Sequence, residues 1–343
     1  MSETESLMRR EIAEIPAAAA RLLDASGADI RAAAAAARSL DPAYIATVAR
    51  GSSDQACTFL KYAAELTLGL PVASLGPSVA SIYRAPLRLA GALAITVSQS
   101  GRSPDIVEMA RAARAGGAMT LAVTNDAGSP LALACDRTLD IQAGPELSVA
   151  ATKTFVTSAL AGLALVAEWK DDRDLRAAIA ALPGHLERAT RADWGALAEL
   201  SGRARSLYTL GRGPSFAMSG EAALKFKETC QIHGENYSSA EVLHGPVSIV
   251  GPDFPVLAFA VPDAAESAVV EVADALAAKG AAVFVTSARA SAATELPAVR
   301  TGHPLTDPLA LVVSFYAMVE RVARARGIDP DRPRHLSKVT ATV

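Results

Sequence analysis

Short apolar segments alternate along this chain with longer segments in which apolar residues recur at helical spacing. The clearest apolar segments are YIATVA, ALAITV and TLAVTN in the first half, and SLYTLG, PVLAFAV and AAVFVTS in the second. Continuously apolar strands between amphipathic helices are typical of a parallel sheet that helices cover on both faces. The pattern therefore predicts an α/β protein with three layers, helices–sheet–helices.

The segment that starts at Pro104 shows how the intervening helices are recognised. Apolar Ile106, Ala110 and Ala113 fall on one helical face, and Gly116 follows as a terminator. The opposite, charged face is expected to hold Asp105, Glu108, Arg111 and Arg114.

Two stretches of the chain resemble each other. YIATVARGSS and SLYTLGRGPS both predict a strand followed by Arg-Gly-x-Ser, and their arginines, Arg50 and Arg212, lie 162 positions apart (212 − 50). Thr124 and Thr286, each near the end of a later strand, show the same separation (286 − 124). These coincidences favour a duplicated α/β unit. The alternative is a chance likeness between two alanine-rich segments.

A chain of 343 residues is long enough for two domains. From the positions of the strands and the polar, alanine-rich stretch between the two halves, we expect an N-terminal helical segment (1–40), a first α/β unit (41–170), a connecting helix (171–195), a second α/β unit (196–330) and a C-terminal tail (331–343).

Composition narrows the class of protein. With 33 basic and 36 acidic residues, the charge is nearly balanced, which argues against a nucleic-acid-binding surface. The longest apolar runs are too short to cross a bilayer, and the charged N-terminus lacks the apolar core of a signal peptide. Three widely spaced cysteines fit a reducing compartment. We therefore expect a cytoplasmic protein that handles small molecules, without nucleic-acid or membrane partners.

A cluster of hydroxyl side chains follows the strand ALAITV. Ser98, Gln99 and Ser100 come directly after it, and Ser103 is placed to cap the helix that Pro104 begins. Serine hydroxyls and the N–H groups of a helix N-terminus suit an anion, and a phosphate monoester fits. The glycine patterns of nucleotide-binding loops are absent. The alternative is that the serines only cap a helix, although the matching place in the second unit, VPDAAES, has no such cluster.

A second stretch of interest is SGEAALKFKETCQIHGENYSSAEVLHGP. Glu221, Lys225 and Glu228 fall on one helix face at i, i+4 and i+7, and His244 follows beside a turn. The simplest interpretation is a surface ion pair plus a second acid. A carboxylate and an imidazole are also what a sugar-ring opening and a proton shift next to a carbonyl require.

The motifs SQSGRSPD and RGSS resemble those of the sugar isomerase (SIS) domain, a family of paired α/β units that bind phosphosugars. EAALKFKE, the later HGP, GPELSVAATKTF and the tail PRHLSKVTATV together resemble the isomerase half of glucosamine-6-phosphate synthases. The resemblance covers nearly the whole chain from about residue 40. It implies two tandem SIS units, each with a flavodoxin-like α/β/α arrangement.

The resemblance also implies site residues. Glu228 corresponds to the family's proton-shuttling glutamate, His244 to the histidine that opens the sugar ring, and Lys338 to the tail lysine at the sugar carbonyl end. The residues that the resemblance implies for substrate binding are Ser52, Ser53, Ser98, Gln99, Ser100, Ser103 and Val149, with Lys225 and Glu221 supporting Glu228.

Some positions depart from the synthase pattern. Ala151 stands where the synthases usually have serine, Arg102 replaces an acid, and GPSVASIYRAP is closer to stand-alone glucosamine-6-phosphate deaminases. Ser2 stands where a synthase has its glutaminase cysteine. We therefore expect a deaminase that converts glucosamine 6-phosphate to fructose 6-phosphate and ammonia.

Other functions stay open at this stage. They are a synthase-like isomerase half that lacks a glutaminase, a deaminase of a related amino-sugar phosphate, and a phosphosugar-sensing regulator. The regulator is disfavoured because about forty residues before the first strand are too few for a helix-turn-helix domain. No metal or cofactor is expected. The resemblance implies a homodimer in which His244 is shared across the interface.

Overall fold

The computed structural model describes residues 5–338. The chain forms two compact units, which are described separately below. The first unit holds residues 17–146 and 153–180 together with residues 337–338 of the tail. The second unit holds residues 5–16, 147–152 and 181–336. The domain boundaries expected from the sequence stay a prediction.

The first unit is built on a five-stranded parallel sheet in the order β2-β1-β3-β4-β5. Its central strand β3 is buried at every position, as its uninterrupted apolar sequence predicts. The strands are β1 (Tyr44–Val48), β2 (Val72–Ser74), β3 (Ala92–Val97), β4 (Met119–Thr124) and β5 (Arg137–Asp140).

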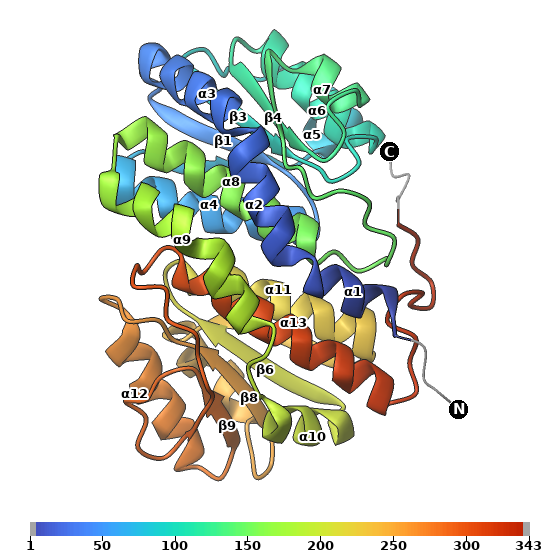
Figure 1. Cartoon of the computed structure of the whole chain (residues 1–343), viewed down its shortest axis with the longest axis vertical. Coiled ribbons are helices and arrows are strands. Elements are labelled where there is room, and N and C mark those ends of the chain that lie inside the picture. The colour runs from blue at the N-terminus through green and yellow to red at the C-terminus, as the bar shows by residue number, and fades with distance from the viewer. Residues whose placement is uncertain (1–4, 339–343) are drawn as a thin grey trace. The chain divides into compact units, whose positions relative to one another are not determined.

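Helices cover both faces of this sheet (Figure 1). On one face lie α3 (Gly27–Leu40), α4 (Ser52–Leu68) and α8 (Lys153–Lys170), and on the other lie α5 (Ser78–Ser81), α6 (Pro104–Ala115) and α7 (Pro130–Ala134). Helix α8 approaches α4 closely at Gly162, where a Cβ would meet the side chain of Leu60 at 3.3 Å. Helix α2 (Ile15–Ala25) lies almost wholly in this unit, and helix α9 (Arg173–Ala189) contributes its residues up to Ala180.

The second unit repeats the same topology. Its parallel strands lie in the order β10-β9-β8-β6-β7. Read from β7 to β10 and numbered from its own first strand, this is the order 2-1-3-4-5 of the first sheet. The strands are β6 (Ser206–Gly211), β7 (His233–Ser238), β8 (Pro255–Phe259), β9 (Ala282–Val285) and β10 (Thr294–Glu295).

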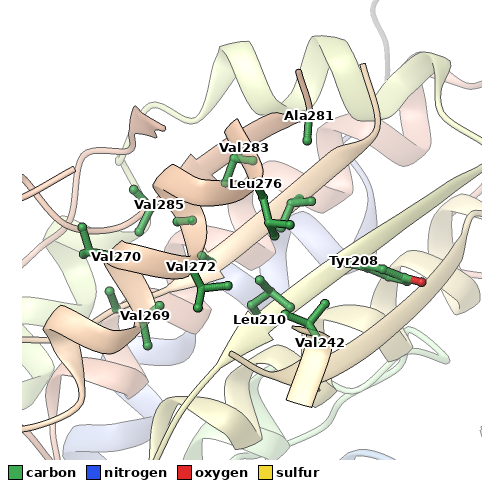
Figure 2. Packing of buried hydrophobic residues seen from close by; sticks show 14 residues of the cluster. Tyr208, Leu210, Val242, Val269, Val270, Val272, Leu276, Ala281, Val283 and Val285 are labelled. Carbon is green, nitrogen blue, oxygen red and sulfur yellow. The ribbon is translucent and has the colours of Figure 1, made fainter. Parts of the chain in front are cut away.

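Helices α11 (Ser215–Cys230) and α13 (Asp307–Ala325) pack together on one face of the second sheet, with α10 (Gly195–Arg203) and α1 (Leu7–Ala13) against α13. Helix α12 (Glu266–Ala277) covers the other face, where its valines and Leu276 meet Leu210, Val283 and Val285 of the strands (Figure 2). Two 3₁₀ helices, η1 (Glu241–His244) and η2 (Pro246–Ile249), follow β7.

The predicted duplication agrees with the helices as well as the strands. Helix α6 spans residues 104–115 and α12 spans residues 266–277, so both begin and end 162 positions apart (266 − 104 and 277 − 115). Ser103 occupies the N-cap position of α6 and Pro104 its first turn, as the sequence predicts. The two-unit α/β fold expected from the sequence is confirmed.

Candidate functional site

A cavity of about 340 Å³ opens in the first unit at the carboxyl ends of β1 and β3. In the sheet order β2-β1-β3, these are the strands between which the connections diverge, and this is where open α/β sheets bind ligands. Three segments supply the lining: the loop after β1, the loop after β3 and the tail. The lining residues are Arg50, Gly51, Ser53, Ser98, Gln99, Ser100, Ser103 and Lys338.

The loop after β3 is held in place by its own backbone. The Gln99 carbonyl accepts a hydrogen bond from the Asn125 N–H, and the Gly101 carbonyl accepts one from Leu131. Gly101 has a φ of 60°, and a Cβ there would lie 2.6 Å from the Cβ of Ser129. Only glycine therefore fits this turn. The Ser103 hydroxyl makes no capping hydrogen bond to α6 and lines the cavity instead.

The loop after β1 joins its strand directly to helix α4. Strands β1 and β3 pair in parallel up to Val48 and Thr96, which places the loop Arg50–Ser53 next to the serine loop. Helix α4 begins at Ser52, so two helices, α4 and α6, have their N-termini at this edge of the sheet. Helix N-termini carry unpaired N–H groups and a partial positive charge, which favour an anion.

Arg50 was not identified from the sequence as a site residue. Its guanidinium Nη2 lies 2.6 Å from Oδ1 of Asp105, and it lines the cavity. Asp105 is only 3% exposed, so its expected place on the outer, charged face of α6 is wrong. The ion pair with Arg50 explains this burial, because a buried carboxylate needs a cation or hydrogen-bond donors. The arginine repeated in RGSS and RGPS was the only signal in the sequence.

Lys338 reaches the same cavity from the tail. Its Nζ lies 2.7 Å from Oε2 of Glu146, a carboxylate whose side chain is fully buried. Glu146 also accepts hydrogen bonds from the backbone N–H and the hydroxyl of Thr154, in the first turn of α8, at 3.1 and 2.6 Å. Glu146 lies within the motif GPELSVAATKTF but was not predicted as a site residue.

A second group of charged residues lies on helix α11 of the second unit. The Lys225 ammonium is 2.5 Å from Oε2 of Glu228 and 3.4 Å from Oε1 of Glu221. The side chains of Glu221 and Lys225 are completely buried, and that of Glu228 is 23% exposed. The interpretation of Glu221 and Lys225 as a surface pair is therefore wrong. The Tyr316 hydroxyl of α13 donates a hydrogen bond to Glu221 at 2.7 Å.

The surroundings of Lys225 keep its side chain positively charged. Burial alone would lower its pKa, but the carboxylates of Glu221 and Glu228 outweigh burial and raise the pKa to about 12. Lys225 is thus a fixed cation that holds one oxygen of Glu228 in place. Such an arrangement suits a carboxylate that must be presented in one orientation.

Two further predicted residues belong to the second unit. His244 is exposed at the end of η1, before Gly245 with a φ of 146°. Val149 lies in a loop that is fastened by its own N–H to the Asp331 carbonyl at 3.1 Å. The same loop is held at Leu147 and Ser148, whose backbone N–H groups donate hydrogen bonds to the carboxylate of Glu11.

The structure thus brings together Ser53, the serine loop and Lys338 in the first unit, and Glu221, Lys225 and Glu228 in the second. Ser52 is the first residue of α4 but is not part of the cavity lining. Val149, Glu228 and His244 belong to the unit that does not contain this cavity.

Comparison with known proteins decides the family. The model of the SIS domain matches residues 41–168 and again residues 202–319. The chain belongs to the SIS family. The first match contains strands β1–β5 and the second contains β6–β10, so each SIS match corresponds to one of the two sheets.

Curated relatives of this SIS chain are named as glutamine–fructose-6-phosphate aminotransferases. It is 37% identical over 269 residues to a glutamine–fructose-6-phosphate aminotransferase (isomerizing) of Aeropyrum pernix, and the match covers 73% of this chain and 43% of that protein. The chain spans about half the length of the curated relatives it matches.

Two solved structures extend the likeness. One, from Silicibacter pomeroyi DSS-3 and described provisionally as a phosphosugar isomerase, is 63% identical with a TM-score of 0.93, covering 95% of this chain and 100% of that one. The other is the C-terminal domain of glucosamine-fructose-6-phosphate aminotransferase from Francisella tularensis, 27% identical with a TM-score of 0.82, covering 97% and 99%.

Residues 5–338 contain no group of three or more His, Cys, Asp or Glu side chains that could hold a metal ion. No helix within the same residues combines the length and the apolar character that a membrane span needs.

Proposed function

We propose that this protein is an isomerising deaminase of hexosamine 6-phosphates, which converts glucosamine 6-phosphate and water to fructose 6-phosphate and ammonia. The observation that supports this most is the cavity at the ends of β1 and β3, whose lining combines serine hydroxyls with two cations. Phosphate oxygens accept hydrogen bonds and carry negative charge, so the serine hydroxyls suit a phosphate monoester, and Lys338 is left to meet the sugar.

In this proposal the phosphate group anchors the substrate, and His244 and Glu228 are the acid–base groups. His244 takes the proton from the sugar O1 and returns one to O5, which opens the ring to the aldehyde. An imidazole suits this step because its ordinary pKa lies near neutral pH. Lys338 lies at the carbonyl end of the open sugar, where its ammonium stabilises the C1 oxygen.

Glu228 then moves a proton from C2 to C1. Loss of the C2 proton gives an enaminolate, which takes up a solvent proton at O1. Return of the first proton to C1 and loss of one N–H proton to the solvent give a ketimine at C2. Water adds to the ketimine and ammonia leaves, so the products are fructose 6-phosphate and ammonia. The fixed Lys225 cation, 2.5 Å from Glu228, supports this role because it holds the carboxylate in one orientation.

The three cysteines of this chain are not part of the proposed chemistry. The nucleophilic form of a cysteine is its thiolate. Burial raises the pKa of Cys135 to about 11 and of Cys230 to about 12, and it raises that of Cys57 as well. None of these three thiols is suited to act as a nucleophile near neutral pH.

A second candidate is the isomerase half of an aminotransferase, running from fructose 6-phosphate with ammonia from elsewhere. It is favoured by the likeness to the Francisella tularensis domain, which covers almost all of both chains. The family habit of sharing the histidine between two copies leads us to propose a homodimer for either function.

The test is an ammonia-release assay on the purified protein with glucosamine 6-phosphate, galactosamine 6-phosphate and unphosphorylated glucosamine. We expect release from the phosphorylated sugars only, and a loss of about 10²- to 10⁴-fold in kcat for Glu228→Gln. The matched control is Glu199→Gln, which changes an exposed glutamate of α10. Synthesis from fructose 6-phosphate and ammonium without measurable release would favour the second candidate.

A further inference from the structure

The cavity of the first unit contains two cations that are each backed by a buried acid. Arg50 pairs with Asp105 at 2.6 Å, and Lys338 pairs with Glu146 at 2.7 Å. The described residues that line the cavity include both cations and no acidic residue. The acids therefore lie behind the lining and the cations lie at it.

The Arg50–Asp105 pair differs in exposure at its two ends. The Asp105 side chain is 4% exposed, whereas that of Arg50 is 42% exposed. The buried carboxylate holds Nη2 of the guanidinium, and the Arg50 side chain is partly accessible and lines the cavity. A guanidinium carries five N–H donors in a planar fork, so it can serve a carboxylate and a phosphate together.

The duplicated second unit serves as an internal control for this pair. Arg212 corresponds to Arg50, but the position of Asp105 is taken there by Ser267, which is exposed (267 − 105 = 162). Within residues 5–338, Arg212 forms no ion pair. Helix α12 nevertheless begins and ends at the positions that correspond to α6. The fold of an SIS unit therefore does not require an acid at this position.

We propose that Arg50 is a direct ligand of the substrate's phosphate group and that Asp105 is its positioning residue. Serine hydroxyls and helix N–H groups are neutral donors, and Arg50 adds a full positive charge to them. Arg50 therefore makes the site selective for a dianionic phosphate monoester over a neutral sugar. This inference rests on the proposed function, since it takes the ligand to be a phosphorylated sugar.

The experiment measures binding rather than turnover, so that it does not depend on the reaction. Dissociation constants for inorganic phosphate and for glucosamine 6-phosphate are determined by calorimetry on the whole chain. Arg50→Gln is expected to raise both by about 10- to 100-fold, because a charge-assisted hydrogen bond is lost. Arg50→Lys should recover part of the affinity. Arg102→Gln is the matched control, since Arg102 lies in the serine loop and pairs with Asp126 at 2.9 Å but does not line the cavity.

A double-mutant cycle separates positioning by Asp105 from a structural role. If Asp105 acts through Arg50, Asp105→Asn alone raises Kd by about 3- to 10-fold, and Arg50→Gln/Asp105→Asn binds phosphate no more weakly than Arg50→Gln. The double variant also removes the unpaired buried charge, so it is the one to use if a single variant folds poorly. In turnover, Asp105→Asn should raise KM and leave kcat within about twofold.

The inference is overturned if Arg50→Gln binds phosphate within twofold of the wild type, or if Arg102→Gln loses as much affinity. Failure of this inference can be told apart from failure of the proposed function. Wild-type protein that binds phosphate through Arg50 but releases no ammonia would contradict only the deaminase. Ammonia release that is unchanged in KM by Arg50→Gln would contradict only the role of Arg50.

Discussion

The Lys225 ammonium lies 2.5 Å from the carboxylate of Glu228, one turn away on the same helix, and is completely buried. A buried cation with two carboxylate neighbours is stable only as a set, because removing one member leaves a charge without compensation. The same set contains the residue that we propose to move the substrate proton. Stability and catalysis are therefore coupled on α11.

The first prediction concerns Lys225→Met. We expect it to lower the free energy of unfolding by about 3–5 kcal/mol, since Glu221 stays buried without its cation. Chemical denaturation measures this loss. Lys279→Met, at an exposed position of the second unit, should change the free energy by less than about 0.5 kcal/mol. A loss equal to that of the control would show that the cluster is not charged as described.

The pH dependence of this effect follows from the raised pKa of Lys225. A raised folded-state pKa means that the stabilisation is fully present below the ordinary value of 10.5 and is lost as pH rises through about 12. The stabilisation by the Lys225 charge should therefore not diminish between pH 6 and pH 9. A wild-type advantage over Lys225→Met that shrinks as the pH rises through this range would contradict the assignment.

Asp274 leads to a prediction with the opposite sign. Backbone N–H groups of Ala293 and Ala292 and the hydroxyl of Ser291 donate to its carboxylate and hold its pKa well below the ordinary value. A lowered folded-state pKa gives stability that is present above about pH 4 and lost as pH falls. Asp274→Asn should lower the melting temperature at pH 7, and by progressively less as the pH falls from 4 toward the lowered pKa. A loss of the same size at pH 7 and at pH 2 would rule out a charged carboxylate as the cause.

Gly101 and Gly69 both have positive φ, 60° and 71°, but only Gly101 is crowded. Gly69→Ala has open space and should cost about 1 kcal/mol, for the left-handed backbone alone. Gly101→Ala should cost about 1–3 kcal/mol more, because its Cβ would overlap Ser129. It should also weaken phosphate binding through the displaced serine loop. If urea denaturation gave the same loss in free energy of unfolding for Gly69→Ala and Gly101→Ala, the described packing would be contradicted.

Glu146 is predicted to position the tail lysine. Glu146→Gln keeps the shape of the side chain but removes the charge that faces Lys338, so kcat/KM should fall by about 10-fold or more. Lys338→Met should lower it at least as much, and the double variant should be no worse than Lys338→Met. Thr154→Val serves as the control, since it removes a hydroxyl that donates to Glu146 and leaves the ion pair intact. Additive losses would mean that the two residues act separately.

Features set by local sequence were predicted well. The continuous apolar character of Ala92–Val97 identified a central strand, and Ser103-Pro104 marked the first turn of α6. These two features depend on residues within a few positions of one another, which a periodic pattern can express. The equal spacing of Arg50 to Arg212 and of Thr124 to Thr286 also indicated the duplication.

The partners behind the site were not predictable in this way. Asp105 meets Arg50 across 55 positions, Glu146 meets Lys338 across 192, and Tyr316 meets Glu221 across 95. Each of these acids looks like an ordinary polar helix or loop residue in the sequence. Only the sheet order and the packing of α11 on α13 determine which cation or hydroxyl each one meets.

The most direct test of the central claim follows the proton on C2 of the sugar. Glucosamine 6-phosphate labelled with deuterium at C2 is incubated with the protein and followed by NMR spectroscopy. We predict that the label leaves C2, appears at C1 of fructose 6-phosphate or in the solvent, and does so as ammonia is released, whereas Glu228→Gln retains it. A wild-type protein that binds the sugar phosphate and leaves the label at C2, or a Glu228→Gln protein that removes it at the wild-type rate, would contradict the account.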